Sequence, residues 1–331
     1  CVPVSVALGL SALATIIGAD TLPIDFVATT AFTAIDSFPI MAIPFFMIAG
    51  GFMETGGMSR RLVEFAKSLV GTIPGGLGII TVIASAFFAA LSGSNPATVA
   101  AIGSIMIPAM VKAGYPLDVA AALAAAAGTL GVIIPPSIPM VTYGVVTNSS
   151  IGDLFVAGIV PGAMIAVSLV CIVFWLAKKY DLRGGEPTSL KKILVSGKDA
   201  LLALMMPIII LGGIYGGVFT PTEAAAVATV YALIVGMFVF REITLADLRN
   251  VIMKAAVSSA VVLFVIATSS SFSWLLTSLQ IPEKVASTML SISNNPTVIL
   301  LLLNVILLFL GSFLETQAII LLVTPIIFPL A

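Results

Sequence analysis

Apolar segments follow one another along the whole chain, and most approach the length that crosses a lipid bilayer as a helix. A spanning helix needs roughly 20 apolar residues, and 60% of this chain is hydrophobic. The sequence therefore predicts an all-α polytopic membrane protein with on the order of ten membrane segments. The segments fall at about 3–18, 38–53, 76–91, 96–111, 117–134, 156–177, 201–217, 221–240, 255–278, 296–312 and 315–331.

Several of these segments cannot cross the bilayer as regular helices. They are shorter than a full span, and Pro-Pro, Ser-Gly-Ser or Gly-Gly interrupts them. Backbone N–H and C=O groups at membrane depth must find partners, so irregular backbone is tolerated there only when it is buried in protein or lines a water-filled cavity. We therefore expect re-entrant hairpins and broken helices among the regular spans.

Charge and composition exclude several classes of function. Lys and Arg (14) nearly balance Asp and Glu (15), so no positive field is available to collect nucleic acid. The chain has no His and only two Cys, Cys1 and Cys171, which argues against zinc, haem and a disulfide framework. An enzyme is not expected, because no nucleophile with a base and no two acids on facing apolar helices are evident. We expect no organic cofactor.

Basic residues predict which loops face the cytoplasm. The longest polar stretch, 178–198, holds six Lys or Arg against two acids, so it is expected inside by the positive-inside rule. Arg60, Arg61 and Lys67 mark 57–74 as a second inside stretch, amphipathic enough to lie along the membrane interface. The turn at 216–223 has no basic residue, and 279–295 has Lys284 alone, so both are expected outside.

The first polar cluster in an apolar setting is Ser-Gly-Ser-Asn-Pro-Ala-Thr, residues 92–98. Gly93 permits a tight turn, and Pro96 removes one backbone donor. In one interpretation this is a hairpin tip, whose freed carbonyls ligate a hard cation while the N-terminus of the next helix meets an anion. In the other it is an ordinary extramembrane turn with a Ser or Asn cap. Four polar side chains are candidates, namely Ser92, Ser94, Asn95 and Thr98.

The second cluster lies at 124–144, in the sequence AAAAGTLGVIIPPSIPMVTYG. Gly128, Thr129 and Gly131 loosen the helix, and Pro135 with Pro136 forbids its continuation. We expect a broken helix whose unwound carbonyls, beside the 92–98 tip, complete a sodium cage of neutral oxygens. A kinked structural helix is the alternative.

The two halves of the chain correspond when the sequence is shifted by about 217 residues, as in transporters built from repeats. Residues 76–108 then lie over 295–325, and the alignment matches Pro108 to Pro325, Ala101 to Ala318 and Ser94 to Gly311. Because one copy follows an inside stretch and the other an outside stretch, the repeats are expected to be inverted. A chance match between apolar stretches is the alternative.

Glu315 is the only acid between Asn304 and Ala331. An ionisable group within an apolar segment is a candidate partner for a proton or cation. Alternatively, it lies near the surface and favours the start of a helix.

Three stretches together resemble the large membrane (M) subunit of tripartite ATP-independent periplasmic (TRAP) transporters, the DctM-like family. They are SGSNPATVAAIGSIMIPAM, AGYPLDVAAALAAAAGTLGVIIPPSIPMVTYG and GVFTPTEAAAVA, in the family's order and spacing. The resemblance implies a multi-pass protein of the bacterial inner membrane with an elevator-type ion-transporter fold. It implies sodium-coupled, secondary-active import of organic acids such as C4-dicarboxylates or sialic acid. It also implies a periplasmic substrate-binding protein and a small four-helix membrane subunit as partners.

Residue roles carried over from the resemblance fall into two sets. The expected sodium (Na+) ligands are Ser94, Asn95, Gly128, Gly131, Ile134 and Ser137. The expected substrate-binding residues are Ser92, Asn95, Pro96, Thr98, Pro136, Glu315 and Thr316. The tips contain no Arg or Lys, so the residues do not single out one carboxylate substrate.

The resemblance covers 1–331 as one permease domain. It divides the chain into a scaffold arm (1–74), a first hairpin with a broken helix (75–150), scaffold helices with the cytoplasmic stretch 178–198 (151–293) and a second hairpin (294–331). Because both ends lie in apolar runs, we expect truncation at both ends, with a second broken helix and second sodium site beyond Ala331. A proton-coupled carrier, or a sodium–anion symporter working without a binding protein, is the alternative function.

Overall fold

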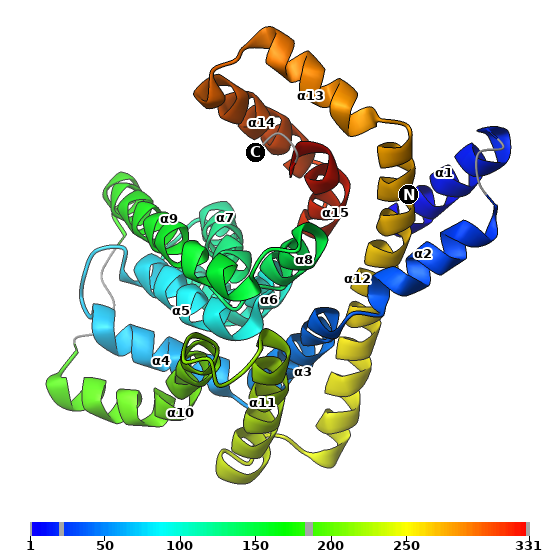
Figure 1. Ribbon diagram of the computed structural model, residues 1–331. Coiled ribbons are helices and arrows are strands. Elements are labelled where there is room, and N and C mark those ends of the chain that lie inside the picture. The colour runs from blue at the N-terminus through cyan, green and yellow to red at the C-terminus, as the bar shows by residue number, and fades with distance from the viewer. Residues whose placement is uncertain (1, 20–22, 183–187, 329–331) are drawn as a thin grey trace. The chain divides into compact units, whose positions relative to one another are not determined.

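The computed structural model describes residues 2–19, 23–182 and 188–328, and within these ranges every regular element is a helix. The predicted all-α class is therefore confirmed. The helices form two compact units (Figure 1). The larger unit comprises Met41–Met140 and Ile151–Ala256, and the smaller comprises Cys1–Ile40, Val141–Ser150 and Val257–Ala331.

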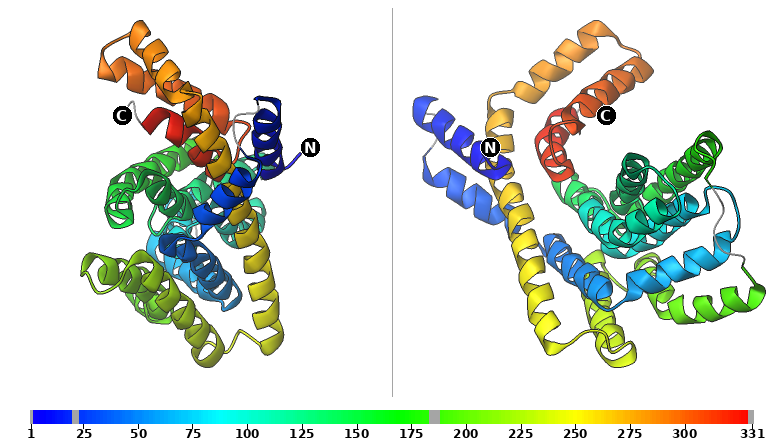
Figure 2. Two further views of the ribbon diagram at one scale, coloured as in Figure 1. Left: turned by 45° about the vertical axis from the view of Figure 1, so that its right-hand side comes forward. Right: turned by 180° about the vertical axis from the view of Figure 1, so that it is seen from behind.

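The larger unit contains the first hairpin and the first broken helix. Its α5–α6 hairpin packs against α7 and α9, as both views of Figure 2 show in cyan and green. Its elements are α3 (Ala42–Thr55), α4 (Met58–Val70), α5 (Gly76–Ser92), α6 (Asn95–Lys112), α7 (Leu117–Gly128), the 3-10 turn η2 (Thr129–Val132), α9 (Ile151–Lys179), α10 (Leu190–Tyr215), α11 (Pro221–Ile234) and the π-helical η3 (Val235–Val239). It also holds the first residues of α8 (Ile138–Thr147) and α12 (Leu245–Ser278).

Helices α3 and α11 make the most extensive helix contact in the larger unit. Small residues on α11 are fully buried there, and small residues let two helix backbones approach closely. The Thr229 hydroxyl donates across the contact to the Phe45 carbonyl at 2.8 Å. At the far end, Gly56 meets Gly236 backbone to backbone. A capping box of Thr220 and Glu223 starts α11.

Helix α4 is amphipathic, as predicted for 57–74. Its apolar face is buried against α5 and α10, and its charged face carries Arg60, Arg61, Glu64 and Lys67. Figure 1 shows α4 running beside α10. The Ser196 hydroxyl on α10 also donates to the Ser68 hydroxyl on α4 at 2.7 Å.

The smaller unit holds the second hairpin. The arms α14 (Pro296–Gly311) and α15 (Thr316–Ile327) contact each other, and α13 (Ile281–Ile292) contacts α15. The remaining elements are α1 (Val4–Ala19), α2 (Asp25–Ile35) and most of the 3-10 turn η1 (Phe38–Met41), of α8 and of α12. Pro108 lies inside α6 and Pro325 inside α15, but the second turn, 312–315, is longer than the first, 93–94.

Five helices among the described residues are long and apolar enough to cross a membrane, fewer than the ten or so segments expected. The other apolar segments are shorter helices, since turns at Gly and Pro divide them. The five candidate spans are Phe38–Thr55, Ile151–Lys179, Leu190–Tyr215, Pro221–Val239 and Leu245–Ser278.

The polar stretches are more helical than the sequence suggests. Residues 190–198 are the start of α10 rather than part of a loop, and the Ser189 hydroxyl caps that helix by accepting from the Lys192 N–H. Helices α2 and α13 also lie outside the predicted apolar segments. Residues 183–187 lie outside the described residues.

We predict that Gly56→Ala destabilises the larger unit by about 1–3 kcal/mol, the usual cost of overpacking. An ideal Cβ at Gly56 would lie 2.7 Å from the Phe52 carbonyl oxygen and 3.1 Å from Gly236 Cα, and backbone atoms cannot move aside. Thermal unfolding in detergent measures the effect. Gly212→Ala is the matched control, because nothing lies within 4 Å of its Cβ; equal melting temperatures for the two variants would contradict the prediction.

Candidate functional site

The tip of the first hairpin is a two-residue turn. Helix α5 ends at Ser92, Gly93 has a left-handed φ of +60°, and Ser94 is extended with φ −140°. Glycine adopts a positive φ without steric cost, which explains why the turn follows Gly93. Helix α6 then begins at Asn95, with Pro96 in its first turn.

Side chains of the tip close the turn on itself. The Thr98 hydroxyl donates to the Ser94 carbonyl at 2.8 Å, and the Thr98 N–H donates to the same oxygen at 3.1 Å. Ser92 Oγ lies 3.0 Å from Thr98 Oγ1. Both side chains are buried, with 2% of Ser92 and none of Thr98 exposed. The 92–98 turn is therefore internally bonded, with Ser92, Gly93 and Thr98 buried and the other residues partly or fully exposed.

The second segment is a helix that stops and restarts. Helix α7 ends at Gly128, η2 adds one 3-10 turn, and residues 133–137 are not helical before α8 begins at Ile138. The Pro135–Pro136 peptide bond in this gap is cis. The Ser137 hydroxyl bridges the gap, since it donates to the Val132 carbonyl at 2.6 Å and accepts from the Met140 N–H at 3.3 Å. The predicted break is confirmed, and the kinked-helix alternative is wrong.

The hairpin tip and the broken helix meet backbone to backbone. The Ile138 N–H donates to the Gly93 carbonyl at 3.2 Å. A Cβ on Gly131 would lie 2.6 Å from both the Ser94 carbonyl oxygen and Thr98 Oγ1. A Cβ on Gly93 would lie 2.8 Å from the Pro136 carbonyl oxygen, and one on Gly128 would collide with Val99. Glycines at these positions are therefore what lets the two segments interlock.

The interlocked segments are rich in neutral oxygens. Asn95 Oδ1 is buried and has no hydrogen-bond partner among the described residues. An unpaired polar atom away from water costs free energy, so such an atom is a candidate ligand. No group of three His, Cys, Asp or Glu residues that could hold a metal occurs in the described part of the chain. Amide, hydroxyl and carbonyl oxygens suit a hard cation, and Asn95 is the side chain best placed to donate one.

The other predicted site residues vary in exposure. Gly128, Gly131, Pro136 and Ser137 are buried, whereas Ser94 and Ile134 are partly exposed. Pro96 is exposed, and so is Thr129, whose hydroxyl donates to the Ala126 carbonyl. The structure thus brings Gly93, Ser94 and Thr98 of the tip against Gly131, Pro136 and Ile138 of the break.

The second tip belongs to the smaller unit. Glu315 is exposed and is the N-cap of α15, where its carboxylate accepts from the Gln317 N–H at 3.2 Å. This position agrees with the capping alternative. Thr316 is the first residue of α15, and Gln317 Oε1 is buried without a partner among the described residues.

Two contacts of the first hairpin were not predicted. Gly50 on α3 lies against Ser92, and a Cβ on Gly50 would make an ordinary contact of 3.5 Å with Ser92 Cα. The Tyr115 hydroxyl accepts from the Gly78 N–H at 3.2 Å near the start of α5, a donor that is shared with the Gly75 carbonyl at 2.9 Å. The Gly50-Gly51 pair inside an apolar segment is the only sequence signal for the Gly50 contact. Nothing in the sequence predicts that Tyr115 contacts Gly78.

A turn that packs against a broken helix, within a set of apolar helices, is typical of secondary transporters. Comparison with known proteins agrees. Residues 1–331 match the model of the family described as "Tripartite ATP-independent periplasmic transporter, DctM component". The chain belongs to this family, and it is a multi-pass protein of the bacterial inner membrane.

Several relatives are transporter permeases rather than enzymes. The isethionate TRAP transporter permease protein DctMQ of Oleidesulfovibrio alaskensis is 49% identical over 330 residues, which are 99% of this chain and 52% of the relative. The C4-dicarboxylate large permease DctM of Pseudomonas aeruginosa is 44% identical, over 98% of this chain and 76% of the relative. The sialic acid large permease SiaM of Vibrio cholerae is 40% identical, over 99% and 77%. The chain thus spans about half of the first relative and about three quarters of the other two.

We predict that Thr98→Val destabilises the protein by about 1–3 kcal/mol, the cost of leaving buried polar partners unsatisfied. The valine keeps the shape of the side chain but leaves the Ser92 hydroxyl without this neighbour and removes one bond to the Ser94 carbonyl. Thr129→Val is the control, since that hydroxyl is exposed to solvent. Thermal unfolding of both variants checks the prediction, which fails if Thr98→Val melts no lower than the control.

Proposed function

We propose that this protein is the large permease subunit of a sodium-coupled importer of small organic anions. The observation that supports this most is the interlock of the 92–98 tip with the 128–137 break. Irregular backbone inside an apolar protein is tolerated where it binds a ligand, and secondary transporters place their substrate and ion sites at such broken helices near the middle of the membrane.

In this proposal, sodium is held by oxygens of both segments. Asn95 supplies its amide oxygen, Ser94 and Ser137 contribute hydroxyl oxygens, and backbone carbonyls come from Gly128, Gly131 and Ile134. Bound sodium supplies a positive charge beside the anionic substrate. Neutral ligands bind a monovalent cation weakly enough for release, which transport requires.

The substrate is proposed to be a carboxylate or sulfonate. The relatives are named for isethionate, C4-dicarboxylate and sialic acid, all small organic anions. The start of α6 presents backbone N–H groups toward the tip, and helix N-termini attract anions. Substrate contacts are assigned to the two tips and the break, at Ser92, Asn95, Pro96, Thr98, Pro136, Glu315 and Thr316. The hydroxyls of Ser92 and Thr98 already hold the turn, so their part is to fix the geometry of the tip.

Transport is proposed to follow an elevator mechanism. The first hairpin with its broken helix (75–150) and the second hairpin (294–331) would move against scaffold helices in 1–74 and 151–293. The helical hairpins α5–α6 and α14–α15, each with a Pro in its second arm, support an inverted repeat.

The partners are proposed to be a periplasmic substrate-binding protein and a small four-helix membrane subunit. The description of the family as tripartite and periplasmic supports both. This chain matches 52% of the relative named DctMQ. About half of that relative therefore lies outside the match.

Uptake into proteoliposomes tests the proposal. The permease is reconstituted with its small subunit and binding protein, and labelled anion is followed under an inward sodium gradient. Import that needs both the sodium gradient and the binding protein supports the proposal. Import driven by a proton gradient alone, or without any binding protein, favours the alternatives and contradicts this one.

We predict that Asn95→Ala raises the sodium concentration for half-maximal uptake about tenfold, since a bond to a charged partner contributes roughly 1.5–3 kcal/mol. Ser104→Ala is the control on the same helix, because that hydroxyl only donates to the Ala101 carbonyl. Sodium titration of uptake measures both variants. An unchanged sodium response in Asn95→Ala would remove this residue from the cation site.

A further inference from the structure

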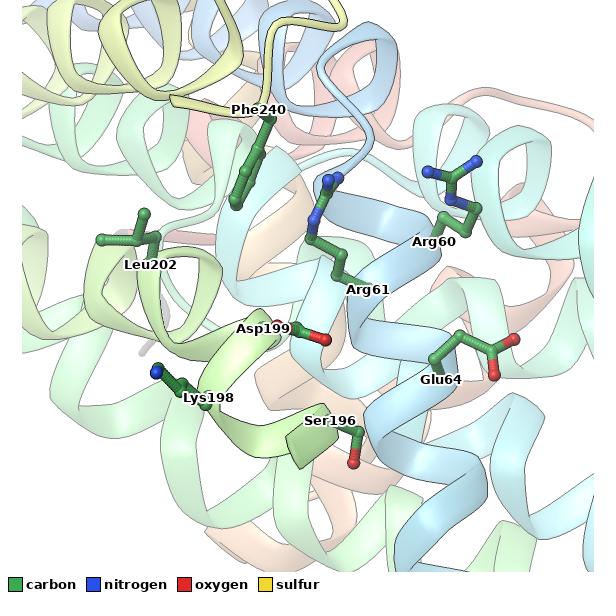
Figure 3. A pocket seen from close by; sticks show the side chains of 8 residues that line it. All are labelled: Arg60, Arg61, Glu64, Ser196, Lys198, Asp199, Leu202 and Phe240. Carbon is green, nitrogen blue, oxygen red and sulfur yellow. The ribbon is translucent and has the colours of Figure 1, made fainter. Parts of the chain in front are cut away.

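Two adjoining cavities lie between α4 and α10, apart from the transport site, with volumes of about 470 and 490 Å³. Glu64, Ser196 and Asp199 line both cavities and so form a shared wall. Figure 3 shows the first cavity, where Asp199 on α10 lies close to the α4 helix that carries Arg61 and Glu64.

Each cavity has its own basic side chains. The first is lined by Arg60, Arg61 and Lys198, and the second by Lys191 and Lys192. Figure 3 shows Arg61 beside Phe240. The Arg61 side chain is held in place, because its guanidinium lies 3.7 Å from the centre of the Phe240 ring and 2.8 Å from a Glu242 carboxylate oxygen. Arg60 and Lys198 are exposed and can reach a ligand.

Basic side chains outnumber acidic ones among the described residues that line the cavities. Glu242 binds both arginines, at 3.1 and 2.8 Å, and Glu64 binds Lys67 at 2.5 Å. Within the described part of the chain, the lining residues and the ion-pair partners just named comprise six basic and three acidic side chains. The basic ones are Arg60, Arg61, Lys67, Lys191, Lys192 and Lys198, and the acidic ones are Glu64, Asp199 and Glu242.

The cavities lie beside the place where α10 changes from charged to apolar. The first third of α10 carries the lysines, and the rest is apolar enough for a membrane span. Leu194, Val195 and Leu201 are more than half exposed on the same stretch, at 67%, 54% and 52%. A basic pocket next to exposed apolar side chains, at the start of a spanning helix, is the arrangement that meets a lipid headgroup and its acyl chains.

We propose that the two cavities bind one anionic phospholipid that carries two phosphates, a cardiolipin-type lipid. One phosphate lies against Arg60 and Lys198, and the other against Lys191 and Lys192. The glycerol hydroxyl that joins the phosphates faces the shared wall, where Asp199 and Ser196 accept its hydrogen bond. The acyl chains cover the exposed Leu and Val side chains of α10. A lipid with a single phosphate fills only one of the two basic cavities.

Native mass spectrometry of the detergent-purified protein, titrated with cardiolipin, phosphatidylglycerol or phosphatidylethanolamine, tests this proposal. Cardiolipin is expected to bind most tightly. Arg60→Gln with Lys198→Gln is expected to weaken cardiolipin binding roughly 10- to 30-fold, given the contribution of each basic residue near anionic lipid. Lys191→Gln with Lys192→Gln is expected to reduce cardiolipin binding to the level of phosphatidylglycerol. Lys112→Gln, which removes an exposed positive charge from the end of α6, is the control.

Three results would overturn the proposal. The first is equal cardiolipin binding by the wild type and both double variants. The second is binding of phosphatidylethanolamine as tight as that of cardiolipin. The third is displacement of bound lipid by inorganic phosphate, which would indicate a site for a soluble anion. All substitutions replace exposed side chains, and thermal unfolding verifies that each variant is folded. The measurement needs no transport, so its outcome is independent of the sodium-coupled function.

Discussion

The hydrogen bond from the Ile138 N–H to the Gly93 carbonyl joins two places where helices are interrupted inside an apolar protein. An interrupted helix frees N–H and C=O groups, and in such surroundings each group must find a partner within the protein or a ligand. In the turn, the Ser94 carbonyl accepts from the Thr98 hydroxyl, and at the break, the Val132 carbonyl accepts from the Ser137 hydroxyl. Among the described residues, the buried Asn95 amide oxygen has no hydrogen-bond partner and is available to bind a ligand.

Much of this arrangement was predictable from local sequence. Two adjacent prolines cannot continue a helix, and a glycine between two serines permits a left-handed turn, so the positions of the break and of the tip followed directly. The sequence alone did not predict why residue 131 must be glycine. It depends on the approach of Ser94 and Thr98, which lie more than thirty positions earlier in the chain, and such a contact is set by tertiary packing. The burial that leaves Asn95 Oδ1 unpaired depends on tertiary packing for the same reason.

The differences from prediction also have physical causes. The start of α10 is helical although it is polar, because Ser189 caps it and because α4 packs against it. Fewer helices are long enough to span a membrane than the composition suggests, because the apolar residues are divided among hairpin arms and broken pieces. Helix α4 connects the α3–α11 pair with the α5–α6 hairpin, and Glu242 fixes its first turn by binding two arginines. The same charged face lines the cavities assigned to lipid, so one amphipathic helix serves both packing and surface recognition.

The central claim is that the tip and the break together form one cation site of neutral oxygens. Structures of the protein determined at high resolution in sodium chloride and in choline chloride test it most directly. The account predicts an ion, present only with sodium, in contact with oxygens from both 94–98 and 128–137, with the contact between Gly93 and Ile138 retained. Identical, ion-free density in both salts, or an ion bound by only one of the two segments, would contradict it.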